Sequence, residues 1–356
     1  MHKLVYIFTA LVLIQCDSND SQTSSNSLSN DDQLNHSAQL VEIDPLKAIE
    51  KEIIENPNST NVYLKRALYY KENREYEKAI EDINRALSLT PDVSILQYHK
   101  AAILYEYAVQ KQDVTYLDES KIYLNNCISE DKVLIEARLL RAKIHLFEEE
   151  TDECMGMLSD VLRINERVAE AYLIKGMAYE FLENATLAAS SYQTAIEVDP
   201  DYYDAYIHRG MLADRLGEDK ALDYYNSALA LEPKSIEAHR NKALHLHFNN
   251  QFMDARASFL DVIQLAPDFE EAYFNIGNTY LGQFAQNEVI TDYVDSAFHY
   301  FSEAYKMNKT YVQAIHNMGV CFEIKGELNV AREHYQKAID LDNNFQPALD
   351  AINDLN

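Results

Sequence analysis

Residues 169–202, AEAYLIKGMAYEFLENATLAASSYQTAIEVDPDY, contain two amphipathic segments separated by a polar break at Asn184. Small and aromatic residues recur in both segments every three or four positions, so they share one face of each helix. They are Tyr172, Gly176 and Tyr179 in the first segment and Ala188, Tyr192 and Ala195 in the second. Pro200 cannot continue a helix and ends the second segment. Because small side chains let helix backbones approach closely, the stretch predicts a helical hairpin.

This hairpin resembles one tetratricopeptide repeat, a helix–turn–helix unit of about 34 residues with small residues at positions 8, 20 and 27 and proline at position 32. With Ala169 as position 1, those places hold Gly176, Ala188, Ala195 and Pro200. Seven further stretches carry the pattern, which places eight repeats over residues 60–345. About six residues are inserted in the second repeat and about eight in the seventh. Helices within 44–59 and 346–356 are expected to cap the array.

The resemblance implies an all-α fold, an α-α superhelix (TPR solenoid) whose first helices line a concave groove. The composition agrees, because only 8 Gly and 7 Pro among 356 residues suit a nearly all-helical chain. A net charge of −27 offers no basic stripe for nucleic acid. The sequence has no phosphate-binding loop, HExxH motif or nucleophile elbow. We therefore expect no enzymatic activity, no cofactor and no small-molecule ligand.

The first residues are typical of a processing signal. A positive region at Met1–Lys3 precedes an apolar run, Leu4–Ile14, that is too short to span a bilayer. The following residues, Leu13-Ile14-Gln15-Cys16, resemble a bacterial lipobox, although Gln15 replaces the usual small residue. This predicts a signal peptide at 1–15 and a palmitoylated Cys16; the alternative is an ordinary secretion signal with an incidental cysteine.

Residues 16–43 are rich in Asp, Ser and Asn, which cannot form a core, and are expected to be a flexible tether. The lipoprotein resemblance implies a protein of the bacterial cell envelope. It would be anchored to a membrane, with the outer membrane favoured on either its periplasmic or its surface face. The sequence leaves the membrane and the face open.

Histidines and cysteines give no metal-binding pattern. His239, His245 and His247 are spread over different faces of one predicted helix, so we expect no metal site there. Cys127 and Cys154 occupy small core positions of the repeats, and free buried thiols are expected rather than a disulfide.

In the family, positions 2, 5, 6, 9, 12 and 13 of each first helix face the groove. In repeats two to four these positions are largely apolar, which makes them a candidate seat for a partner's helix or peptide. The residues of this strip are Ile103, Leu139, Leu140, Leu146, Phe147, Leu173, Ile174, Met177 and Phe181. The alternative is that some of them pack against a neighbouring first helix.

Repeats six to eight carry amides instead. Asn241, Asn275 and Asn317 all occupy position 6, with Asn278 alongside. This set is similar to the asparagine ladder of O-linked N-acetylglucosamine transferase, where amides bind a peptide backbone through their donor and acceptor. Arg240 is placed as in a carboxylate clamp, but Leu244 and Gln313 replace other members of that clamp.

Three function classes are compatible with the sequence. The leading one is a lipid-anchored scaffold that binds a peptide or helix of another envelope protein. The second is a surface glycan-binding lipoprotein, which the complete lack of Trp disfavours although 25 Tyr are present. The third is a regulatory subunit of an envelope enzyme or secretion complex. The partner's identity cannot be read from the fold.

Overall fold

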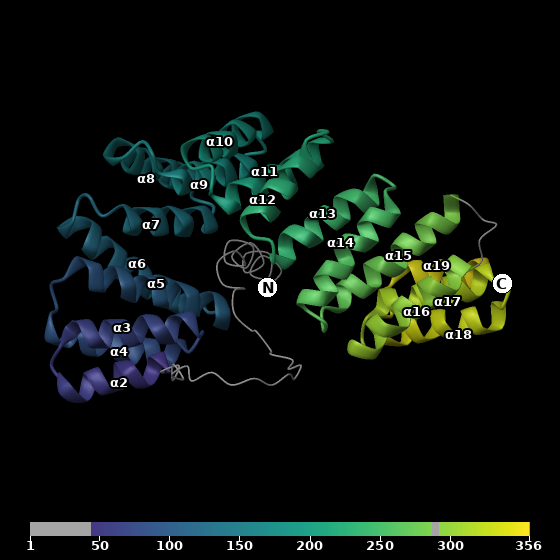
Figure 1. Ribbon diagram of the computed structural model, residues 1–356, viewed down its shortest axis with the longest axis horizontal. Helices are drawn as coiled ribbons and strands as arrows, with labels where there is room; N and C mark the ends of the chain where they lie inside the picture. Colours follow the sequence, from purple (N-terminus) through teal and green to yellow (C-terminus); the bar gives the residue numbers. More distant parts are fainter. Residues whose placement is uncertain (1–43, 287–291, 356) are drawn as a thin grey trace, which may run out of the picture. The chain divides into compact units, whose positions relative to one another are not determined.

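A computed structural model describes residues 44–286 and 292–355. The predicted signal peptide 1–15, Cys16 and the tether 16–43 lie outside the described residues. Throughout the described ranges the secondary structure is entirely helical, from α2 to α19, with no strand (Figure 1). No described helix is both long enough and apolar enough to cross a membrane. The all-α prediction is confirmed.

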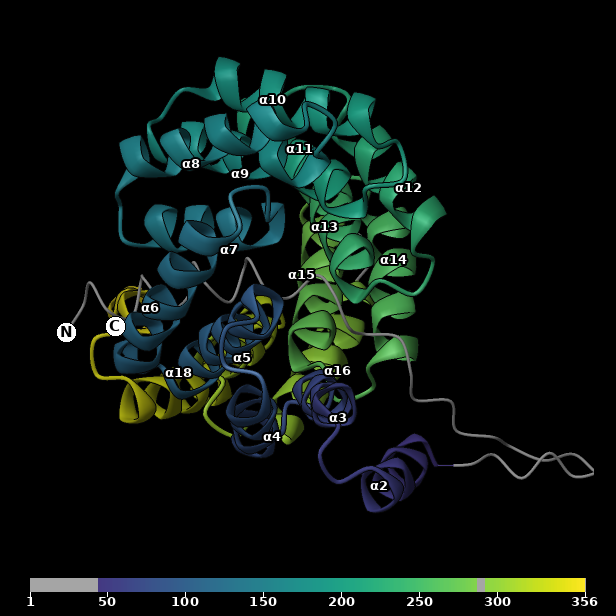
Figure 2. The same cartoon turned by 90° about the vertical axis from the view of Figure 1, so that its left-hand side faces the viewer.

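The chain divides into two compact units, which we call unit 1 (up to Tyr202) and unit 2 (Tyr203–Asn356). Unit 1 contains a single helix, α2, followed by four helical hairpins. Its helices are α2 (Pro45–Glu55), α3 (Thr60–Glu72), α4 (Tyr76–Leu89), α5 (Ser94–Lys111), α6 (Val114–Glu130), α7 (Ile135–Phe147), α8 (Thr151–Ile164), α9 (Ala169–Phe181) and α10 (Ala185–Val198). Each helix packs against the next along the chain (Figure 2).

Unit 2 contains four further hairpins and one terminal helix. Its helices are α11 (Tyr203–Leu216), α12 (Ala221–Leu231), α13 (Ile236–Phe248), α14 (Phe252–Leu265), α15 (Glu270–Gln286), α16 (Asp292–Met307), α17 (Val312–Ile324), α18 (Leu328–Leu341) and α19 (Gln346–Asp354). The additional residues expected in the second repeat lengthen both of its helices, since α5 has 18 residues and α6 has 17.

Aromatic side chains of the second helices fill the space above the small residues of the first helices. Tyr192 and Tyr225 are fully buried, and their rings lie against Gly176 and Gly210. A Cβ atom added at Gly176 would overlap Tyr192 Cε1, so a larger residue cannot fit without displacing the ring. The same contact joins Gly277 to Phe301 and Gly319 to Tyr335. The small residue at position 8 is therefore required by the aromatic residue that faces it.

The turn inside each hairpin has a shared geometry. In six repeats the residue at position 15 has a positive φ, and these residues are Arg74, Glu149, Glu183, Gly217, Asn250 and Gly326. Glycine adopts this left-handed conformation without steric cost, whereas the other residue types do not. The turn geometry is therefore imposed by packing of the two helices rather than by glycine alone.

Three cysteines are part of the core. Cys127, Cys154 and Cys321 are buried and free, which confirms the expected thiols at the two positions singled out from the sequence. Burial raises the pKa of Cys127 to about 11. It raises the pKa of Cys154 and of Cys321 to about 12. These thiols are protonated at neutral pH and serve as small apolar side chains.

Candidate functional site

Six residues of the predicted apolar strip lie in the core and require a correction. Leu139, Leu140, Leu173 and Ile174 are 4, 8, 6 and 0% exposed, and Ile103 and Leu146 are 0 and 9% exposed. Five of them, Ile103, Leu139, Leu140, Leu146 and Ile174, belong to hydrophobic clusters of unit 1, where α7 contacts α9 as well as its own partner helix. Neighbouring first helices therefore bury these side chains, and we no longer count them as an open apolar binding surface.

The other three residues of the strip are more exposed. Phe147 and Met177 are half-buried and pack at the edges of the same clusters. Phe181, at the end of α9, is 50% exposed. A single exposed ring does not form a strip. The described part of unit 1 therefore lacks the continuous apolar surface that the sequence predicted.

A cavity lies in unit 2, and we call it the apolar pocket. It has a volume of about 820 Å³ and is formed by α11, the turn that follows it, α12 and α13. Its lining residues are Met211, Asp214, Arg215, Gly217, Glu218, Asp219, Leu222, Tyr225, Asn241, Leu244, His245, Phe248, Asn249 and Gln251. This size is within the range of cavities that hold a ligand or several side chains of a partner.

Apolar side chains in this pocket are open to solvent. Phe248 is 76% exposed and Met211 is 39% exposed, while Leu222 and Leu244 are half-buried. Phe248 ends α13, and Met211 lies in the second half of α11. Exposed large apolar groups beside a concave surface are a signature of a protein contact site. Covering Phe248 and Met211 would remove apolar area from water and stabilise a complex.

Asn241 gives the apolar pocket a directed polar group. It is 7% exposed, and its Oδ1 accepts a hydrogen bond from Arg240 at 3.5 Å. Its Nδ2 is buried without a hydrogen-bond partner. Arg240 is itself held by Glu271, with its Nη2 2.8 Å from Glu271 Oε1. The neighbouring guanidinium thus fixes the orientation of the amide, which leaves a donor available for a ligand carbonyl.

One wall of the apolar pocket is a hydrogen-bonded network. The Tyr225 hydroxyl donates to Asp214 at 2.7 Å, and His245 Nδ1 bonds the other oxygen of the same carboxylate. Burial, together with the bond to Asp214, raises the pKa of Tyr225. Tyr225 therefore remains a hydrogen-bond donor at neutral pH, and the wall is held by three side chains from α11, α12 and α13.

A smaller cavity lies in unit 1, and we call it the ion-paired pocket. It has a volume of about 200 Å³ between α3, α5, α7 and α9. Its lining residues are Lys71, Tyr98, Ala102, Tyr105, Glu106, Glu136, Leu139, Leu140, Lys143 and Glu170. Two ion pairs cross it: Lys71 Nζ lies 2.9 Å from Glu106, and Lys143 Nζ lies 2.7 Å from Glu170.

The predicted asparagine ladder is only partly assembled. Asn317 Nδ2 donates to Asn278 Oδ1 at 2.9 Å, so these two amides are joined by one hydrogen bond. Asn275 is half-buried and makes no hydrogen bond with another described residue. Asn241 lines the apolar pocket, whereas the other three do not. Among the four amides, Asn241 therefore has the clearest capacity to bind a ligand.

The histidines of α13 face different partners. His239 Nε2 bonds the Pro233 carbonyl at 3.0 Å, whereas His245 bonds Asp214. His247 lies between the rings of Phe248 and Phe252, and burial lowers its pKa. No two of these imidazoles converge on one point.

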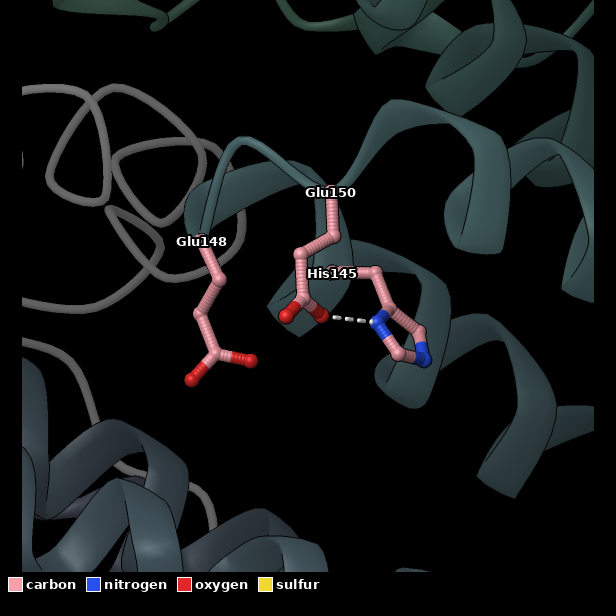
Figure 3. Close-up of side chains that lie close together, drawn as sticks. All are labelled: His145, Glu148 and Glu150. Atoms are coloured by element: carbon pink, nitrogen blue, oxygen red, sulfur yellow. Dashed lines mark hydrogen bonds and ion pairs between the residues drawn. The ribbon is translucent and has the colours of Figure 1, made fainter.

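A different histidine lies beside two carboxylates at the end of α7. Ligand atoms of His145, Glu148 and Glu150 all lie within 4.8 Å of one another. Figure 3 shows the Glu150 carboxylate against the His145 ring, and the two are 2.7 Å apart. Glu148 instead pairs with Lys121 at 2.5 Å and Arg141 at 3.8 Å. A metal ion would have to displace these cations from Glu148. The bond between His145 and Glu150 instead links the two sides of the α7–α8 turn.

Comparisons with known proteins agree with the helical hairpins. The family model described as tetratricopeptide repeat matches residues 60–93, 169–202 and 312–345. The chain therefore contains tetratricopeptide repeats. One curated relative is the DnaJ homolog subfamily C member 7 homolog of Schizosaccharomyces pombe, 22% identical over 293 residues, which are 79% of this chain and 56% of that protein. The chain spans about half the length of the curated relatives it matches first.

Two solved structures share the fold. A chain in the crystal structure of the APC/C hetero-tetramer Cut9-Hcn1 has a TM-score of 0.54 and 15% identity, covering 88% of this chain and 60% of that chain. PilW, titled a widely conserved type IV pilus biogenesis factor, has a TM-score of 0.51 and 17% identity, covering 62% of this chain and 98% of its own. At these identities the likeness concerns the fold alone.

Several residues of the apolar pocket were not predicted as binding residues. Met211 and Phe248 occupy positions 9 and 13 of the first helices of repeats five and six, which are groove positions in the family. The groove positions of the family, applied to repeats five and six, would have identified Met211 and Phe248. Leu222 comes from a second helix, and no sequence signal places it beside the first helices.

Proposed function

We propose that this protein is a scaffold that binds a peptide or helix of a partner protein, and that the apolar pocket of unit 2 is the seat. The observation that carries the proposal is the combination of exposed Phe248 and Met211 with the unpartnered Nδ2 of Asn241 in one cavity. One relative, the mitochondrial import receptor subunit TOM70 of Homo sapiens, is named as a receptor, which supports a protein ligand.

The binding chemistry follows from the lining. An apolar side chain of the partner would cover Phe248 and Met211, which supplies most of the affinity. A backbone carbonyl of the partner would accept a hydrogen bond from Asn241 Nδ2 and so satisfy a buried donor. Among the described lining residues Phe248 is the one exposed aromatic ring, and Met211, Leu222 and Leu244 are aliphatic, which favours a polypeptide over a sugar, since sugars stack on several aromatic faces. Binding of this kind requires no catalytic step, in keeping with a non-enzymatic role.

The location is also part of the proposal. Cleavage before Cys16 and its lipidation would anchor the protein to a membrane of the bacterial envelope, and residues 16–43 would hold the repeats away from the lipid. Incorporation of radiolabelled palmitate into the wild-type protein, and its loss in Cys16→Ser, is the expected result. Equal labelling of both proteins would rule out an anchor at Cys16.

Binding is tested by selection of a displayed peptide library on the full chain carrying Cys16→Ser. We expect the enriched peptides to share apolar residues and to lose binding to a Met211→Asp, Phe248→Asp double variant. The matched control is Phe181→Asp, which changes a half-exposed ring in unit 1. Peptides that bind the double variant as well as the parent chain would contradict a seat in the apolar pocket.

A further inference from the structure

The ion-paired pocket of unit 1 has more carboxylates than ammonium groups. Glu106 and Glu170 are neutralised by Lys71 and Lys143. Glu136 also lines the pocket, is exposed, and makes no hydrogen bond or ion pair with any residue the structure describes. The lining therefore carries one uncompensated negative charge. A chain with a net charge of −27 does nothing to offset it.

The negative charges of the three carboxylates act on one tyrosine of the pocket. Tyr98 lines the pocket, and its pKa is raised to about 12. Burial is the first cause, followed by the negative charges of Glu170, Glu136 and Glu106. All three carboxylates thus act on the Tyr98 hydroxyl, although they come from α5, α7 and α9.

A buried polar group lies in the wall of the same cavity without a hydrogen-bond partner. Tyr105 lines the pocket and is 4% exposed. Its hydroxyl is buried and makes no hydrogen bond. A buried hydroxyl without a partner costs free energy, which a ligand group at hydrogen-bond distance would recover. Because the hydroxyl oxygen accepts hydrogen bonds, it is suited to an N–H donor.

We infer that the ion-paired pocket is a subsite for a cationic side chain of a bound polypeptide, with arginine as its preferred occupant. A guanidinium offers several N–H donors in one plane, so it can bond the Glu136 carboxylate and the Tyr105 oxygen together. A volume of about 200 Å³ fits the head of one long side chain and not a helix. The subsite lies in unit 1, so it adds to the proposed apolar seat and does not depend on it.

Other occupants fit the lining less well. An anion would meet three carboxylates, and the two lysines that could attract it are already paired. A metal ion would have to compete with those same ammonium groups for Glu106 and Glu170. An uncharged side chain would leave Glu136 uncompensated. The charge and the hydrogen-bonding groups therefore favour a positively charged donor.

The experiment uses the full chain carrying Cys16→Ser and three short probes. These are acetyl-Gly-Arg-Gly-amide, its citrulline analogue, which has nearly the same shape but no charge, and its glutamate analogue. Binding is followed by NMR through the backbone amides of Ala102 and Leu139, which lie in the pocket wall. We expect the arginine probe to bind about tenfold more tightly than citrulline, and the glutamate probe not to bind.

Variants assign the effect to the pocket. Glu136→Gln should weaken the arginine probe about fivefold, and Tyr105→Phe should weaken it about threefold without loss of helicity. Glu153→Gln makes the same change of net charge on the exposed surface of α8 and should have no effect. Equal binding of arginine and citrulline, tighter binding of glutamate, or insensitivity to Glu136→Gln would overturn the inference. A Phe248→Asp variant that no longer binds the selected peptides should still show the NMR shifts caused by the arginine probe. The two proposals can therefore be refuted independently.

Discussion

The two pockets differ both in their place in the repeats and in their chemistry. The ion-paired pocket of unit 1 holds about 200 Å³ and is lined by first helices alone, whereas the apolar pocket of unit 2 holds about 820 Å³ and is also lined by a second helix and by turns. In unit 1, lysines and glutamates of neighbouring helices neutralise one another. In unit 2, Phe248 and Met211 have no such partners and remain exposed. The side chains that line each pocket therefore determine which ligand it can bind.

The first prediction concerns the former apolar strip and has the largest expected effect. Leu173→Asp places a carboxylate at a site that is 6% exposed, so we expect the free energy of unfolding of unit 1 to fall by about 3 kcal/mol or more. Urea denaturation followed by circular dichroism measures this change. Phe181→Asp, at a 50% exposed site, is the control and should change stability by less than about 0.5 kcal/mol. Similar stability of both variants would return Leu173 to the candidate binding surface.

The second prediction uses the buried thiols, of which unit 1 has two and unit 2 has one. Their pKa values are raised from 9.0 to about 11 for Cys127 and about 12 for Cys154 and Cys321. The folded state therefore holds these protons more tightly than the unfolded state. The contribution of the protonated thiols to the free energy of unfolding is complete below pH 9.0 and is lost as the pH rises toward about 11 to 12.

At pH 10 each thiol should lower the free energy of unfolding by about 1 kcal/mol, and unit 1 should lose more than unit 2. Pulsed alkylation of the Cys16→Ser chain in urea, with mass spectrometry of each cysteine, reports the two units separately. A variant with alanine at the three buried cysteines is the control, and its stability should depend less on alkaline pH. Alkylation of the native thiols at neutral pH without denaturant would show that they are not buried.

The third prediction has the smallest effect and compares Asn241 with Asn275 as contributors to peptide binding. Asn241→Ala should weaken binding of a selected peptide about fivefold, because it removes one hydrogen bond to the peptide backbone. Asn275→Ala lies outside the apolar pocket and should leave the affinity unchanged. Isothermal titration calorimetry of both variants gives the comparison. An equal loss in both would favour a ladder of amides over the single donor proposed here.

The sequence predicted the helical hairpins well because their determinants are local. The contact between Gly176 and Tyr192 joins positions 8 and 24 of one repeat, so its spacing is visible in the sequence. The burial of Leu139 and Leu173 was not predictable from such a local spacing. Their burial depends on contact between first helices of neighbouring repeats, which the groove positions of the family alone do not resolve.

The candidate sites show the same limit. Asn241 was predicted from its position, but its unpartnered Nδ2 follows from the placement of Arg240 and Glu271 on two different helices. The groove positions of the family include the place of Phe248, but they do not predict that its ring is 76% exposed. The excess charge of the ion-paired pocket depends on which lysine pairs with which glutamate across neighbouring helices. Pairing of this kind is a property of the packed structure.

The most direct test of a binding seat in unit 2 is the affinity of one selected peptide for Phe248→Asp and for Phe181→Asp. Both variants replace an exposed ring at the end of a first helix, one in each unit. Phe248→Asp should weaken binding about 30-fold, as expected for an aromatic contact at the centre of an interface, while Phe181→Asp leaves it unchanged. Full affinity in Phe248→Asp, or an equal loss in both variants, would contradict the apolar pocket as the seat.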